Sequence, residues 1–236
     1  MPEPKVSLTV TGSNLDRAVN EAAAAVRSES YAHHESLWRA YVEVGDLIFA
    51  LVAQGASDAA TTEAQARRIS LTANLVQSTT VVEYLVSSGF YWSGAAVLRQ
   101  HMETLARTIM IRTGRQQPET KTPNVRVLPY RLSKNYGRLS ELVHTSGGES
   151  LADFAEARDG PEVATAKPSY RKPWAYALFC LHIAQLVALA YEIDLLHREI
   201  YPGRELIDAH GSLASIADAL VKVGFWECLP ACEDPT

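Results

Sequence analysis

The most regular hydrophobic pattern in the chain lies in the segment that ends at Gly55. Its apolar side chains recur at intervals of three and four residues, and the stripe consists of Leu37, Ala40, Tyr41, Val44, Leu47, Ile48 and Leu51. Residues three and four apart lie on the same side of an α-helix, so this stripe predicts a helix of about five turns with one buried face. The glycine is expected to end that helix.

Helical spacing recurs in most of the remaining chain. The segments that show it span about 13–26, 58–88, 90–113, 129–145, 174–200 and 206–220. The second of these is apolar on more than one face, with Ile69, Ala73, Val76, Val81 and Leu85, so we expect it at the centre of a bundle. Together the segments predict an all-α fold, a single bundle of about seven helices.

Only residues 5–11 alternate between apolar and polar side chains as a short strand would. With no second strand to pair with, this segment is expected to be an arm. The predicted organisation is therefore an N-terminal arm over 1–12, a helical bundle domain over 13–224 and a C-terminal tail over 225–236.

Composition agrees with a soluble protein. Hydrophobic residues make up 47% of the chain and charged residues 21%, as in ordinary globular proteins. The apolar run from Ala175 to Tyr191 has 17 residues and would reach only about 26 Å of a hydrocarbon core of about 30 Å, so we expect a buried helix and no membrane contact. Three cysteines without a signal sequence favour reduced thiols and a cytoplasmic location.

The net charge of −5 gives no overall attraction to nucleic acid, but one stretch of the chain is strongly basic. Between residues 107 and 138 a single acidic residue, Glu119, accompanies eight basic ones: Arg107, Arg112, Arg115, Lys121, Arg126, Arg131, Lys134 and Arg138. This stretch is a candidate surface for a polyanion, and a basic surface that is merely solvated is the alternative.

Candidate chemistry lies in the predicted helix over 129–145. Tyr136, Ser140 and His144 are spaced four apart and therefore share one ridge of that helix. A histidine in the last helical turn lies near the negative end of the helix dipole, which favours its charged form. A purely structural role is the alternative, because histidines commonly cap helix ends.

Two sequence elements resemble a family of proteins. The run Ala95-Ala96-Val97-Leu98-Arg99 followed by Glu103, and Tyr136 followed by Leu139-Ser140 and His144, resemble a bacterial family of uncharacterised helical proteins related to the HEPN superfamily. Members of that superfamily are helical bundles and often dimers. Many are metal-independent endoribonucleases of toxin-antitoxin and phage-defence systems. Their signature is an arginine followed a few residues later by a histidine, and Arg138 and His144 fit it with five residues between them.

The resemblance implies a chemistry that needs no cofactor. His144 would take the proton from a ribose 2′-hydroxyl, and Arg138 would hold the scissile phosphate. Arg131 and Lys134, with Tyr136 and Ser140, would contact the RNA. The partners implied are RNA, an antitoxin or another protein, and a second copy of the chain in a homodimer. The family usually has a polar residue directly after the arginine where this chain has Leu139, so a non-catalytic binding or interaction protein of the same fold is the alternative.

Two further pairings rest on spacing. Arg99 and Glu103 lie one helical turn apart and are expected to form a structural ion pair. Glu141 with His144, and Asp194 with His197, each place a carboxylate and an imidazole on one helical face, as in bundles that hold two metal ions. With Glu103 and Glu83 as further carboxylates, a di-metal enzyme is a second alternative.

Overall fold

The structure is a computed structural model that describes residues 14–55, 61–115, 117–118, 120–143, 167–205 and 207–222. These ranges contain seven α-helices, one short 3-10 helix and no strand, so the prediction of an all-α bundle is confirmed. The predicted arm over 1–12, its strand over 5–11 and the tail over 225–236 lie outside the described residues. The helices are α1 (Asn14–His33), α2 (Glu35–Ala53), α3 (Glu63–Ser87), α4 (Tyr91–Arg112), η1 (Val125–Val127), α5 (Ser133–Val143), α7 (Lys172–Ile200) and α8 (Ala209–Lys222).

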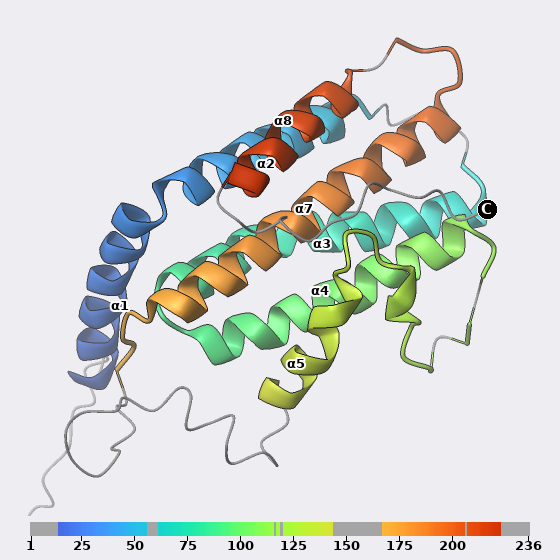
Figure 1. Cartoon of the computed structure of the whole chain (residues 1–236). Coiled ribbons are helices and arrows are strands. Elements are labelled where there is room, and N and C mark those ends of the chain that lie inside the picture. Colours follow the sequence, from blue (N-terminus) through green and yellow to red (C-terminus); the bar gives the residue numbers. More distant parts are fainter. Residues whose placement is uncertain are drawn as a thin grey trace, which may run out of the picture.

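Helix α7 is the central element of the bundle. It packs against α2, α3, α4 and α8, and in Figure 1 it runs diagonally with α2 and α8 on one side and α4 and α5 on the other. It is the one helix of the described ranges that is long and apolar enough to cross a membrane, but 83% of its most apolar window is buried inside the bundle. Burial against other helices therefore accounts for its composition, as the sequence predicted.

The hydrophobic stripe of α2 is buried as predicted, and α2 packs against α7 and α8. Six of its members are buried and Tyr41 packs against the core from a partly buried position. The helix ends near the expected glycine, because Gln54 caps it and the amide of Gly55 donates to the carbonyl of Val52.

Helix α3 begins later than its hydrophobic pattern predicted. Thr62 is the N-cap: its hydroxyl accepts a hydrogen bond from the amide of Gln65 at 3.2 Å, and the Gln65 side chain accepts one from the amide of Thr62 at 2.9 Å. This reciprocal pair satisfies two amides that a helix start leaves without partners, so it fixes the first turn at Glu63. Gly89, with a φ of 85°, then provides the sharp reversal into α4.

Helix α3 packs against α4 and α7, and the side it buries does not follow the apolar positions of its sequence. The structure buries the polar residues Arg68, Thr72 and Glu83, whereas Ile69 and Val81 are 41% and 48% exposed. The apolar positions of this helix are scattered around its axis, so hydrophobicity alone does not select a face. The side that turns inward combines the buried aliphatic residues Leu75, Val82 and Val86 with ion pairs to other helices.

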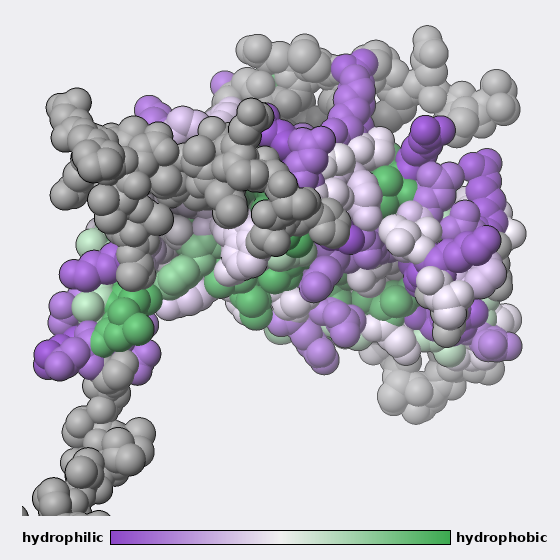
Figure 2. Space-filling view, turned by 90° about the horizontal axis from the view of Figure 1, so that it is seen from below, coloured by the Kyte–Doolittle hydropathy of each residue, from purple (hydrophilic) through white to green (hydrophobic). Residues whose placement is uncertain are grey.

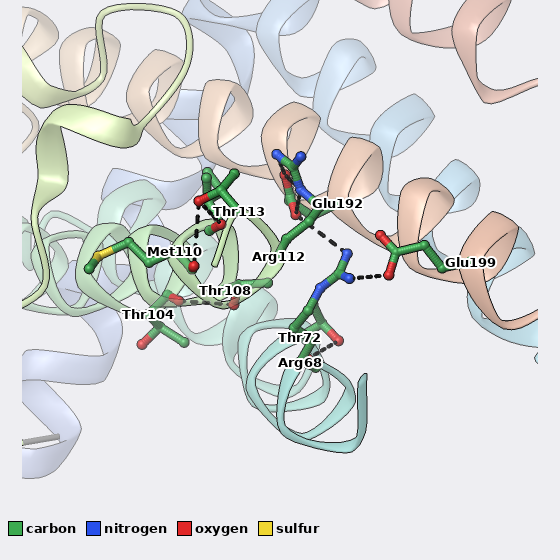
Figure 3. A network of polar contacts seen from close by, with 10 residues as sticks. Arg68, Thr72, Thr104, Thr108, Met110, Arg112, Thr113, Glu192 and Glu199 are labelled. Carbon is green, nitrogen blue, oxygen red and sulfur yellow. Dashed lines mark hydrogen bonds and ion pairs between the residues drawn. The ribbon is translucent and has the colours of Figure 1, made fainter. Parts of the chain in front are cut away.

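Several of these ion pairs form a network that joins α3, α4 and α7 (Figure 3). Arg112 donates hydrogen bonds from Nε and Nη2 to the two carboxylate oxygens of Glu192, at 3.0 and 2.9 Å. Arg68 bonds Glu199 through Nη1 and places Nη2 3.9 Å from Glu192. Arg68 and Glu192 are each only 2% exposed. Buried charges are tolerated only when paired in this way, so the network fixes the relative positions of the three helices.

A further ion pair joins α1 to α3. The Glu83 carboxylate is buried and accepts hydrogen bonds from Arg27 Nη2 at 2.9 Å and from the Tyr31 hydroxyl at 2.7 Å. The Arg27 guanidinium also lies over the rings of Tyr31 and Tyr84, at 5.3 and 5.4 Å from their centroids. Glu83, one of the carboxylates of the di-metal alternative, is therefore engaged with two side chains of α1.

Candidate functional site

The candidate site is built on α5 and the chain that leads into it. Leu128 and Leu132, ahead of the helix, and Leu139 and Leu142, within it, are buried and hold the segment against α4. Between the first two leucines, Tyr130 and Arg131 have positive φ values of 56° and 53°. Left-handed backbone at two successive residues with side chains is strained, so the packed leucines must maintain this turn.

Three side chains connect α5 to α4. The Tyr136 hydroxyl donates to Glu103 Oε1 at 2.6 Å, and Arg99 reaches the same carboxylate oxygen from Nε and Nη2, both at 3.1 Å. The Arg99 guanidinium lies 5.7 Å from the centroid of the Tyr136 ring. The structure thus places Arg99 and Glu103 in an ion pair, and it places Tyr136 in an anchoring position between helices. The interaction with the Tyr136 hydroxyl raises the pKa of Arg99, burial opposes this shift, and the Glu103 carboxylate adds to it.

Arg138 faces a different direction from Tyr136. Arg138 comes two positions after Tyr136, which corresponds to a rotation of about 200° around the helix axis, so the two side chains do not share a ridge. The Arg138 side chain is exposed, and its guanidinium carbon lies 5.5 Å from the centroid of the Trp174 ring at the start of α7. A cation over an indole face is attracted by the electron density of the ring, so Trp174 positions Arg138 without neutralising it.

Arg138 borders a cavity of about 350 Å³ between α5 and the first turns of α7. Asn135 and Arg138 supply charged or amide groups to its wall, while Leu139, Leu142 and Trp174 are among the apolar residues. The cavity is large enough for a nucleobase or a similar ring. An apolar hollow with an arginine at its edge can hold an aromatic group and bind an adjacent anion.

The basic stretch divides into two groups in the structure. Arg112 belongs to the buried ion pair with Glu192, and Arg107 donates to the Lys121 carbonyl at 2.8 Å, so both have structural roles. The prediction that all eight residues face a ligand is therefore wrong for these two. The other six are exposed and have no carboxylate partner within the described ranges: Arg115, Lys121, Arg126, Arg131, Lys134 and Arg138.

The face of the molecule on which α5 lies is seen from below in Figure 2. Hydrophobic surface shows in its middle and at its left, and hydrophilic side chains lie at both ends. This face therefore combines apolar and hydrophilic surface.

Two other predicted site residues have different outcomes. Ser140 lies on α5 and is partly buried. His144 follows Val143, the last residue of α5, and lies outside the described residues, as does Glu119. The predicted pairing of Arg138 with His144 is therefore a matter of sequence spacing alone.

The residues of the di-metal alternative are engaged elsewhere or do not converge. Glu103 is held by Tyr136, Asp194 is fully buried and bonds Arg198 Nε at 2.8 Å, and Glu141 is exposed. Burial lowers the pKa of His197, which lines a separate cavity. Within the part of the chain that the structure describes, no three or more His, Cys, Asp or Glu residues are grouped to hold a metal.

Comparison with known proteins adds no match: no family model, no curated protein and no solved structure matches the chain. Function must therefore be argued from the residues themselves. The α5 surface is where exposed basic side chains, an aromatic ring and a cavity occur together.

Proposed function

We propose that this protein is a HEPN-like RNA-binding protein that cleaves RNA without a metal ion, with Arg138 and His144 as its catalytic residues. The observation that carries the proposal is the state of Arg138. It is exposed at the edge of a cavity, held over Trp174, and has no carboxylate partner among the described residues. Such an arginine keeps its hydrogen-bond donors for an incoming phosphate.

The proposed reaction is transfer within the RNA backbone. His144 takes the proton of a ribose 2′-hydroxyl, and the 2′-oxygen attacks the adjacent phosphorus. The 5′-oxygen of the next nucleotide leaves with a proton from solvent, so the products carry a 2′,3′-cyclic phosphate and a 5′-hydroxyl. Arg138 stabilises the charge that develops on the phosphate, and one base stacks in the cavity beside Trp174.

The exposed residues ahead of α5 contact the RNA backbone in this proposal. Arg126, Arg131 and Lys134 precede Arg138 along the chain and are all exposed. Contacts of this kind release counterions from the nucleic acid, so binding should weaken steeply with salt. Ser140 adds a hydroxyl for the backbone.

The biological setting is also part of the proposal. A metal-independent RNase of this type would act in the cytoplasm as a homodimer, in a toxin-antitoxin or phage-defence system with a protein antitoxin as its inhibitor. Light scattering on the purified chain should give the mass of two copies, and a monomer at micromolar concentration would contradict the dimer.

Cleavage of single-stranded RNA in EDTA tests the catalytic role. Wild-type protein should cut, while Arg138→Ala and His144→Ala should each lower the rate at least a hundredfold. Arg39→Ala is the matched control, because Arg39 is an exposed arginine on α2 that pairs only with the neighbouring Glu35. If Arg138→Ala and His144→Ala each cleave RNA at the wild-type rate, the mechanism is refuted.

A non-catalytic RNA-binding protein is the second candidate. It is favoured by the structural roles of two residues near the motif: Leu139 is buried, and Tyr136 is held by Glu103. In this case RNA stays intact in EDTA, but fluorescence anisotropy detects binding that Arg131→Ala and Lys134→Ala weaken. Absence of both cleavage and binding would exclude RNA as the ligand of this surface.

A further inference from the structure

A second cavity, of about 370 Å³, lies between the end of α2, the first half of α3 and the end of α7. It shares no lining residue with the cavity beside Arg138. Helix α3 contributes Ile69, Ala73 and Val76 to its wall, and α7 contributes Ile193, Leu196 and Ile200. These positions repeat at three- and four-residue intervals, so each helix presents apolar side chains to the cavity. Thr72, Gln77 and Tyr201 add polar side chains to the wall.

The cavity lies where α2 and α3 each pack against α7, and the α7 residues Ile193 and Leu196 form its buried floor. Val52 on α2 and Ile69 on α3 stand on either side and are both exposed. Leaving apolar side chains in contact with water costs about 25 cal/mol for each Å². A ligand with an apolar body would recover that free energy by covering them.

No carboxylate, lysine or arginine lines this cavity, and its only imidazole belongs to His197. The Nδ1 atom of His197 is buried without a hydrogen-bond partner, while its Nε2 lies 3.8 Å from the position that a Cβ on Gly55 would occupy. No described residue forms a hydrogen bond with Nε2. Burial lowers the pKa of His197, so the ring is neutral at pH 7 and can either donate or accept through this nitrogen.

We propose that this cavity binds a small uncharged molecule, a medium-chain alcohol or ketone, whose chain covers the apolar side chains of α3 and α7 and whose oxygen bonds His197. The size of the cavity is typical of sites for small molecules. The apolar part of the lining selects the chain, and a wall whose polar side chains include no carboxylate, lysine or arginine selects an uncharged oxygen. A carboxylate would lose its hydration without gaining a cationic partner in the wall, so it should bind less well.

Calorimetric titration of the full chain with 1-octanol, 2-octanone and octanoate tests the ligand class. We expect saturable binding of octanol and octanone, and binding of octanoate at least tenfold weaker. If octanoate binds as tightly as the alcohol, the choice of an uncharged ligand is wrong. If none of the three binds in a saturable way, the site itself is refuted.

Substitutions locate the site. Ala73 is an exposed residue of the wall, so Ala73→Phe should fill the cavity from its mouth and lower octanol affinity at least tenfold. Ala24→Phe places the same ring at an exposed alanine of α1 and serves as the control. His197→Phe should weaken octanol binding about fivefold through loss of one hydrogen bond. Circular dichroism establishes that each variant folds, and Val76→Phe is a second way to fill the cavity. Unchanged affinity in both filled variants would overturn the proposal.

Discussion

Mild acid should destabilise this protein through two histidines in its core. His182 on α7 is fully buried, and its ring nitrogens make no hydrogen bond of good geometry; a loose contact with the Thr79 backbone is the polar interaction nearest to them. His101 on α4 is also buried, with Nε2 2.8 Å from the Ser78 hydroxyl. Burial disfavours the charged imidazole and lowers the pKa of His101 to about 4 and that of His182 to about 3. Both rings are therefore neutral in the folded protein.

In the unfolded chain both rings should titrate near the ordinary histidine pKa of 6.5. Below that pH the unfolded state takes up protons that the folded state does not. The stabilising effect is thus complete above pH 6.5 and is lost as the pH falls toward the folded-state values. Each histidine costs about 1.4 kcal/mol per pH unit in this window, which gives about 2 kcal/mol per residue and about 4 kcal/mol for both between pH 7.5 and 5.0. This is a large share of the ~5–15 kcal/mol by which domains are stable.

Urea unfolding followed by far-UV circular dichroism from pH 7.5 to 5.0 measures this loss. In His182→Leu a side chain without polar atoms replaces a ring whose nitrogens make no hydrogen bond of good geometry, so stability at pH 7.5 should stay within about 1 kcal/mol of wild type. The part of the acid loss due to His182, about 2 kcal/mol, should disappear. His210→Gln, at an exposed position of α8, is the control and should keep the wild-type pH dependence.

Two results would refute this reasoning. An unchanged pH dependence in His182→Leu would mean that the ring is accessible to protons in the folded state. A loss of more than about 3 kcal/mol at pH 7.5 would mean that its nitrogens make hydrogen bonds that the substitution breaks.

Three further predictions concern polar contacts and one turn. Glu192→Gln should lower the free energy of unfolding by about 3–5 kcal/mol in urea denaturation, because Arg112 would lose its carboxylate partner and Arg68 would keep only Glu199; a loss below about 1 kcal/mol would contradict the buried network. Tyr136→Phe should cost about 1–2 kcal/mol and speed amide hydrogen exchange in α5, and exchange equal to wild type would show that this bond does not hold the helix. Gly89→Ala should cost about 1–3 kcal/mol and lower Tm, because its φ is 85° and the new Cβ would lie 3.0 Å from Val26 Cγ1; an unchanged Tm would exclude strain at this turn.

The fold was predictable where the hydrophobic pattern has one clear period. The stripe of α2 is of this kind, and its members are buried as expected. In α3 the inward face carries paired charges beside the aliphatic residues Leu75, Val82 and Val86. Arg68 pairs with Glu199, 131 residues further along the chain, and Glu83 pairs with Arg27, 56 residues before it. Patterns within one helix contain no information about such partners, so the exposed positions of Ile69 and Val81 could not be deduced.

The same limit applied to the candidate site. The spacing of Arg99 and Glu103 within one turn of α4 is a local relation, and the pair forms in the structure. The bond from Tyr136 to Glu103 joins two helices 33 residues apart, so the tyrosine looked like a substrate contact when only its own helix was considered. Likewise, a count of basic residues could not reveal that Arg112 turns inward to Glu192.

The surroundings of the arginines give a physical criterion for choosing among them. Arg68 and Arg112 face carboxylates, and an ion pair occupies the donors that a phosphate would need. Arg138 instead lies against the face of Trp174, a contact that orients the guanidinium plane but uses none of its N–H groups. An anion that binds there displaces water and does not have to displace a carboxylate of the protein. Arg138 is therefore the arginine on this surface at which substitution should affect ligand binding more than stability, and that difference separates a functional role from a structural one.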